Sequence, residues 1–176
     1  MLGRVEVCVT FELKTLSSEA VPRAIEKAER YRLLNEPSQA ESICLDALQI
    51  DPYNRQALVT LLLSLTDQFD ADTPSAVRDA FAIVERIDDA YDRAYYSGIV
   101  RERRAKARLR RGAPGCGPRA YEWLREAMTW YERAEAIRPH GNDDALLRWN
   151  TCARLIMSDR RLTPAVEERG EPLLLE

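Results

Sequence analysis

Two segments far apart in the chain share one arrangement of small and large residues. In each, an alanine is followed four residues later by a larger residue, three residues later by another alanine, and five residues later by a proline. Spacings of three and four residues place side chains on one face of a helix, and a proline ends a helix. The pattern therefore predicts a repeated helical unit whose small residues let two helices approach closely. The positions are Ala40, Cys44, Ala47 and Pro52 in the first segment and Ala127, Tyr131, Ala134 and Pro139 in the second.

The remainder of the chain after residue 17 also has helical character. Apolar residues recur with the helical period, and short segments rich in Pro, Gly, Asn and Asp separate them. We expect Gly112–Pro118 to be a flexible loop, 17–160 to be the helical domain, and 161–176 to be a C-terminal tail. The seven helices are expected at about 18–34, 38–50, 54–69, 74–88, 90–111, 119–137 and 144–160.

The N-terminal segment has the alternation of a short β-strand. Between residues 4 and 13, one parity is apolar and the other is mostly polar. A lone strand needs a partner edge for its backbone groups, and the same strand of a second copy would supply one. Residues 1–16 are therefore expected to form an arm, with a homodimer through this strand and a frayed extension as equal alternatives. The apolar positions are Val5, Val7, Val9, Phe11 and Leu13.

The repeated pattern resembles the tetratricopeptide repeat, a helix–turn–helix unit with small, aromatic and proline residues at fixed spacing. The resemblance covers about 21–160. It implies an all-α fold, a right-handed solenoid of three helix pairs with a final capping helix. An ordinary helical bundle is the alternative. Besides the eight residues given above, the resemblance rests on Ala28 and Tyr31 in the first helix and on Gly98 at the small position of the third unit.

Composition restricts the classes of function. The 176 residues are 45% hydrophobic and 31% charged with a net charge of −3, so bulk attraction to nucleic acid or anionic lipid is not expected. No stretch of about 18 apolar residues predicts a membrane-spanning helix, and the N-terminus has no apolar signal segment. We therefore expect a cytoplasmic protein whose four cysteines are reduced.

Residue types that would carry catalysis or bind a metal are scarce. The chain has one histidine and no Cys-x-x-Cys pair, which leaves too few regularly spaced ligands for a metal site. The phosphate-binding motifs GxxxxGK[ST] and GxGxxG do not occur. We therefore expect no enzyme activity, no catalytic residue, no metal and no cofactor.

The resemblance implies a binding function for the helical domain. Proteins of the tetratricopeptide class usually capture an extended peptide or a helix in the concave groove formed by the first helix of each pair. The expected function is thus that of a non-catalytic scaffold or adaptor for an unidentified protein or peptide. The groove positions that the resemblance implies are Ile25, Glu29, Arg32, Val59, Leu63, Thr66, Tyr95, Ile99, Glu102, Arg103 and Trp149.

A basic segment supports an alternative function. Residues 101–111 contain seven basic residues and one acidic residue. Helical spacing aligns Arg101, Arg104, Arg108 and Arg111 in one stripe, which would bind the phosphates of nucleic acid or an acidic partner. The opposing interpretation is a solvated face whose charges are paired. This interpretation, or an acidic partner, is favoured over nucleic acid because the chain is acidic. The expected pairing partners are Glu122, Glu126, Asp88, Asp89 and Asp92.

Overall fold

The computed structural model describes residues 10–70 and 74–165. This part of the chain is all-helical, as expected, and contains seven α-helices and one 3-10 turn. Most helix boundaries lie within a few residues of the expected ones. The elements are η1 (Ser18–Ala20), α1 (Val21–Leu33), α2 (Pro37–Ile50), α3 (Arg55–Asp67), α4 (Pro74–Val84), α5 (Ala90–Arg111), α6 (Cys116–Ala136) and α7 (Asp144–Ser158).

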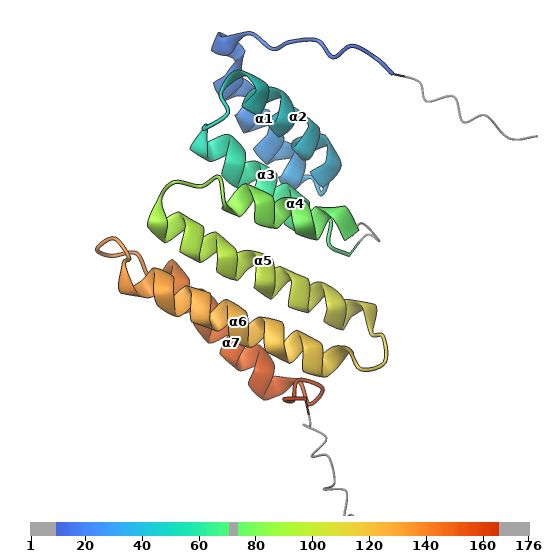
Figure 1. Ribbon diagram of the computed structural model, residues 1–176, viewed down its shortest axis with the longest axis vertical. Helices are drawn as coiled ribbons and strands as arrows, with labels where there is room; N and C mark the ends of the chain where they lie inside the picture. Colours follow the sequence, from blue (N-terminus) through green and yellow to red (C-terminus); the bar gives the residue numbers. More distant parts are fainter. Residues whose placement is uncertain (1–9, 71–73, 166–176) are drawn as a thin grey trace, which may run out of the picture.

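The helices are stacked in the order of the sequence. Each helix packs against the next one along the chain, and α5 and α6 form the most extensive of these contacts. Figure 1 shows the resulting arrangement, in which α1 and α7 lie at opposite ends of the long axis. Among more distant helices, α1 contacts α3 and α3 contacts α5. Each helix is therefore stabilised mainly by its neighbours in sequence.

Local signals determine where α3 and α5 begin and where α5 ends. Asn54 Oδ1 accepts a hydrogen bond from the backbone N of Ala57 at 3.0 Å and caps α3. Asp89 Oδ1 accepts one from the backbone N of Asp92 at 2.8 Å and caps α5. Gly112, with φ of +66°, ends α5 in the left-handed conformation that glycine adopts without a steric penalty.

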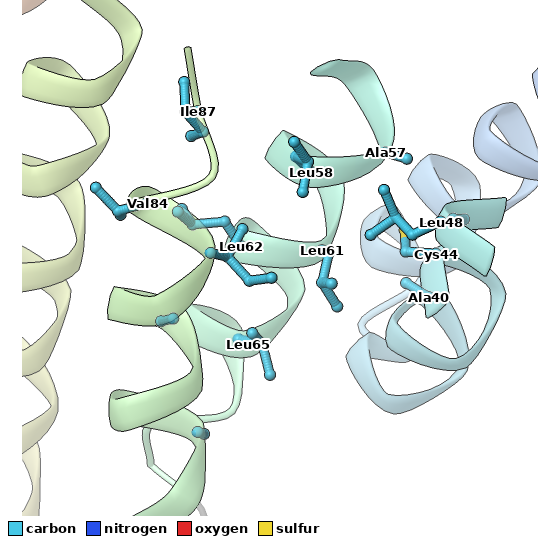
Figure 2. Close-up of a cluster of buried hydrophobic side chains, with 14 of the residues drawn as sticks. Ala40, Cys44, Leu48, Ala57, Leu58, Leu61, Leu62, Leu65, Val84 and Ile87 are labelled. Atoms are coloured by element: carbon cyan, nitrogen blue, oxygen red, sulfur yellow. The ribbon is translucent and has the colours of Figure 1, made fainter. Parts of the chain in front are cut away.

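The hydrophobic core consists of two clusters, one over α1 to α4 and one over α5 to α7. Figure 2 shows part of the first cluster, in which Leu61 lies on the side of α3 next to α2 and Leu62 lies on the side next to Val84 of α4. Val100 of α5 belongs to this first cluster, and Leu63 packs against both clusters. The core is therefore continuous across α5.

The small residues of the repeated pattern lie at fully buried positions. Tyr31 is half-buried against the first cluster, and Pro52 and Pro139 follow the ends of α2 and α6. Helices can approach closely where these small side chains meet. The fully buried members of the pattern, each with 0% exposure, are Ala28, Ala40, Cys44, Ala47, Ala127, Tyr131 and Ala134.

The expected loop Gly112–Pro118 is shorter than the sequence indicated, because α6 begins at Cys116. Gly117 lies in the first turn of α6, where a Cβ would collide with the backbone carbonyl of Arg161. Pro118 also lies in the first turn, where a backbone N–H has no partner within the helix. Both residues that suggested a loop are therefore compatible with the start of a helix.

The N-terminal strand is not confirmed. Its described part, 10–13, forms no strand, and 4–9 lie outside the described residues. The side chains of Phe11 and Leu13 are 85% and 70% exposed. A strand needs an edge to pair with, and the helices described here provide none.

Candidate functional site

Side chains from α1, α3, α5 and α7 converge on a polar groove. Its cavity volume is about 390 Å³, and residues Asn35, Pro37 and Thr66 form its uncharged lining. Cations outnumber carboxylates five to two in the lining, which gives the groove a positive local charge. The charged lining residues are Arg32, Arg103, Lys106, Arg110 and Arg148, with Asp67 and Glu102.

Asp67 joins three of these helices at the groove. The Nη2 atom of Arg32 in α1 lies 2.9 Å from Asp67 Oδ2, and Arg103 in α5 forms an ion pair with the same carboxylate. Arg103 Nη1 also donates to Thr66 Oγ1 at 2.8 Å. These contacts hold both guanidinium groups in place before any ligand arrives.

Glu102 is a fully buried carboxylate at the floor of the groove, with 0% exposure. Its Oε2 accepts a hydrogen bond of 2.6 Å from the hydroxyl of Tyr131 in α6. Its Oε1 forms an ion pair with Lys106 one turn along α5 and lies 3.4 Å from Nη1 of Arg148 in α7. A buried charge requires such partners, since an unpaired one carries a large desolvation penalty.

Two members of this network, Tyr131 and Arg148, have raised pKa values. Burial and the neighbouring Glu102 charge raise the pKa of Tyr131, so its hydroxyl stays protonated and donates. Burial lowers the pKa of Arg148, whereas the charge of Glu102 and a hydrogen bond with Tyr95 raise it. The raising effects together are larger, so the net shift of this pKa is upward. Arg148 therefore remains charged at neutral pH.

Four of the predicted groove residues line the groove: Arg32, Thr66, Glu102 and Arg103. In contrast, Ile25 and Ile99 are each 1% exposed and belong to the core clusters. Their place in the packed interior removes these two from any surface open to a partner. The expected apolar anchors of the groove are thus replaced by charged side chains.

The other predicted groove residues lie outside the groove lining. Glu29 accepts a hydrogen bond of 2.9 Å from Gln56, and Trp149 donates one of 2.9 Å to Glu132 beside a separate hollow. The half-buried Val59, Leu63 and Tyr95 complete this group, and Leu63 and Tyr95 pack against the core.

Sequence reasoning missed several residues of the groove lining, although α5 carried a signal for two of them. Glu102, Lys106 and Arg110 recur every four residues and so share one helix face. Arg148 had no comparable signal, because its place in the groove depends on how α7 packs. Asp67 had none either.

The basic segment of α5 is divided between two faces. Arg103, Lys106 and Arg110 face the groove, whereas Arg104, Arg108 and Arg111 line a second cavity. Three residues of the stripe predicted from helical spacing therefore lie on one face of α5, and the groove cations lie on another face of the same helix.

Arg101, the first residue of that stripe, has a paired environment. Its Nε lies 3.3 Å from Oε2 of Glu126, as the pairing interpretation predicted. Its guanidinium also lies 4.9 Å from the ring centre of Phe81 and 5.1 Å from that of Trp130. Burial, as the main cause, lowers the pKa of Arg101.

Two expected pairing partners of the stripe are engaged elsewhere. Glu122 pairs with Arg119 at 2.7 Å, and Asp92 pairs with Arg55. The remaining two, Asp88 and Asp89, form no ion pair with the stripe among the described residues.

Comparisons with family models, with curated proteins and with solved structures give no match. Within 10–70 and 74–165, no cluster of three or more His, Cys, Asp or Glu side chains has the arrangement of a metal site. In the same ranges, no helix has both the length and the apolar character needed to cross a bilayer. The cysteines Cys44, Cys116 and Cys152 are buried free thiols.

Proposed function

We propose that this protein is a non-catalytic cytoplasmic scaffold that binds an acidic segment of a partner protein in the groove of α1, α3, α5 and α7. The observation that carries the proposal is the convergence of five cations and two carboxylates from four helices on one groove. Guanidinium groups bind carboxylates through paired, charge-assisted hydrogen bonds. A partner segment rich in Asp or Glu therefore complements this groove.

The rigidity of the groove supports this function. Arg32 and Arg103 are held by Asp67, and Arg148 is held by the buried Glu102. A ligand that meets side chains already in position loses less conformational entropy on binding. We further propose that the stacked helices form a tetratricopeptide-like right-handed solenoid, a proposal supported by the order of packing and by the buried small residues.

Arg110 is the groove cation best placed to exchange its partner. It pairs with Asp70, and the two side chains are 58% and 49% exposed. Exposed ion pairs contribute little to stability, about 0–1 kcal/mol. Arg110 can therefore exchange Asp70 for a carboxylate of the partner at little cost to the fold.

Affinity capture with a groove variant tests the proposal. The tagged full chain and its Arg110→Glu variant are incubated with lysate, with and without nuclease, and bound proteins are quantified by mass spectrometry. Arg154→Glu is the matched control, because Arg154 is exposed on α7 and outside the groove lining.

The proposal predicts a nuclease-resistant partner that the control retains and Arg110→Glu loses. A partner retained equally by both variants would contradict groove binding. Recovery only without nuclease would instead favour nucleic-acid binding through Arg101, Arg104, Arg108 and Arg111.

A further inference from the structure

A second cavity lies on a different face of α5 from the groove, and its volume is about 590 Å³. It is bounded by α4, by the C-terminal half of α5 and by the first part of α6. Helix α4 has 11 residues and α5 has 22, so α4 leaves part of α5 uncovered. We call this cavity the arginine–aromatic pocket.

The walls of the arginine–aromatic pocket are apolar. Val77 and Phe81 come from α4, Trp123 comes from α6, and Phe69 comes from the segment just after α3. Trp123 is only 8% exposed, which makes it part of the wall and leaves little of its ring open to solvent. An aliphatic side chain placed between these walls would be removed from water, which is favourable.

The charged lining of the pocket is cationic. Arg104 and Arg108 enter it from α5, and no acidic residue occurs among the described residues that line it. The guanidinium carbon of Arg104 lies 3.9 Å from the ring centre of Trp123, and that of Arg108 lies 5.9 Å from it. These contacts with the aromatic face orient both guanidinium groups.

Both arginines contact the ring of Trp123, and one buried donor of Arg108 has no acceptor within the described part of the chain. Among the described residues, neither forms an ion pair, and Arg108 Nε is buried without a hydrogen-bond partner. Buried donors without acceptors are costly, so such a group indicates a missing partner. Burial, followed by the positive charge of Arg119, lowers the pKa of Arg104. An anion in the pocket would relieve both effects.

We propose that the arginine–aromatic pocket is a second binding site, separate from the groove, for a partner protein segment in which a glutamate or aspartate adjoins a leucine-like side chain. The carboxylate accepts hydrogen bonds from Arg104 and Arg108, and the aliphatic side chain packs against the part-buried Val77 and Phe81 of α4.

A peptide fits this pocket better than a nucleic acid does. Bases bind proteins by stacking on open aromatic faces. Here the face of Trp123 is covered by Arg104, and the ring is nearly buried. The chain also carries a net charge of −3, which disfavours a polyanion at long range.

The test uses a fluorescein-labelled peptide of alternating glutamate and leucine and measures its Kd by anisotropy with the full chain. The Arg104→Gln/Arg108→Gln variant is expected to weaken binding about tenfold or more, because two charge-assisted contacts are lost. Arg154→Gln is the matched control, since Arg154 is an exposed arginine of α7 that lines neither the groove nor this pocket. The control is expected to keep Kd within about twofold.

Two altered peptides test the site without changing the protein. Replacing glutamate by glutamine removes the charge, and replacing leucine by serine removes the apolar group. Each peptide is expected to bind about tenfold more weakly or worse. Equal binding of all three peptides, or equal Kd for the wild-type chain and the Arg104→Gln/Arg108→Gln variant, would overturn the proposal. A loss confined to the groove variant Arg110→Glu would place the peptide in the groove and support only the first proposal.

Two further outcomes would assign the pocket to another occupant. A labelled oligothymidine that binds more tightly than the peptide and is lost in Arg104→Gln/Arg108→Gln would make the pocket a nucleic-acid site. The chain also contains the segment 167–175, which has three glutamates and three leucines. If replacing those leucines by serine tightens peptide binding at least about fivefold, the chain's own segment is the occupant.

Discussion

The aromatic ring of Tyr131 in α6 lies directly against Gly98 in α5. A Cβ at position 98 would lie 2.7 Å from Cδ1 and 2.8 Å from Cζ of that ring. The absence of a side chain at Gly98 therefore lets the ring lie against the backbone of α5. From this position the Tyr131 hydroxyl reaches Glu102 one turn further along α5. The close approach of two helices thus also satisfies a buried charge.

Replacing Gly98 by alanine is expected to destabilise the protein by about 1–3 kcal/mol, because the added methyl group overpacks the contact with Tyr131. Alanine alone would favour the helix by about 0.5–1 kcal/mol, so the two effects have opposite signs. Urea denaturation measures the net change. Gln39→Ala, at an exposed position of α2, controls for helix propensity. A Gly98→Ala protein as stable as wild type would contradict the close contact.

Removing the Tyr131 hydroxyl is expected to lower the free energy of unfolding more than removing the Tyr121 hydroxyl. Tyr131→Phe leaves a lone pair of the buried Glu102 carboxylate without its donor, which costs about 1.5–3 kcal/mol. Tyr121→Phe is the control, because Tyr121 is a half-buried tyrosine of the same helix and, among the described residues, the tyrosine hydroxyl bonded to Glu102 is that of Tyr131.

A double-mutant cycle with Glu102→Gln isolates the pair. We expect a coupling free energy between Tyr131→Phe and Glu102→Gln of about 1 kcal/mol or more. Additive effects of the two substitutions in urea denaturation would show that the hydrogen bond contributes nothing specific.

The two helix caps are expected to contribute similar amounts to stability. Asn54→Ala and Asp89→Ala each remove the acceptor of one backbone N–H, and each is expected to lower the free energy of unfolding by about 1 kcal/mol. Thermal denaturation followed by circular dichroism measures both. Asp88→Ala, next to the cap of α5 and exposed, is expected to have no effect. A loss at Asp88→Ala equal to that at Asp89→Ala would refute the capping role.

Stability is expected to fall at alkaline pH because of the buried thiols. Burial raises the pKa of Cys44 and of Cys152 from 9.0 to about 12. Since the folded pKa is the higher one, this contribution is fully present below pH 9.0 and is lost as the pH rises from 9.0 towards 12.

The Cys44→Ala variant measures the size of this effect. Between about pH 8 and about pH 10.5, we expect it to lose less stability than wild type, by on the order of 1–2 kcal/mol. Leu48→Ala removes packing from the same helix without removing a thiol, and it should keep the wild-type pH dependence. An identical pH dependence for Cys44→Ala and wild type would rule out a raised thiol pKa.

Much of the helical framework could be predicted from local signals. The start and end of α5 follow from Asp89 and Gly112, which act within one turn of the helix. The start of α6 was misplaced because Gly117 and Pro118 usually interrupt helices. Gly117 is accommodated there by the backbone of Arg161, a contact between residues far apart in sequence.

The candidate groove could be predicted only in part. The resemblance grouped Glu102 and Arg103 in one expected groove, and both side chains line the polar groove of the structure. Helical spacing put Arg104 in a stripe apart from Arg103, and the two side chains line different cavities. Which helices each face of α5 meets depends on packing and could not be predicted. The burial of Ile25 and Ile99 likewise depends on neighbouring helices.

The sequence by itself determined the class of the fold, the number and position of the helices, and the small residues where helices meet, because periodicity, caps and breakers act over a few residues. The tertiary structure alone brought Arg148 of α7 to Glu102 of α5 and placed one basic face of α5 in the groove and another in the arginine–aromatic pocket. The side of α5 that each cation occupies is decided by the helices packed against it, and helix packing is a property of surfaces distant in sequence.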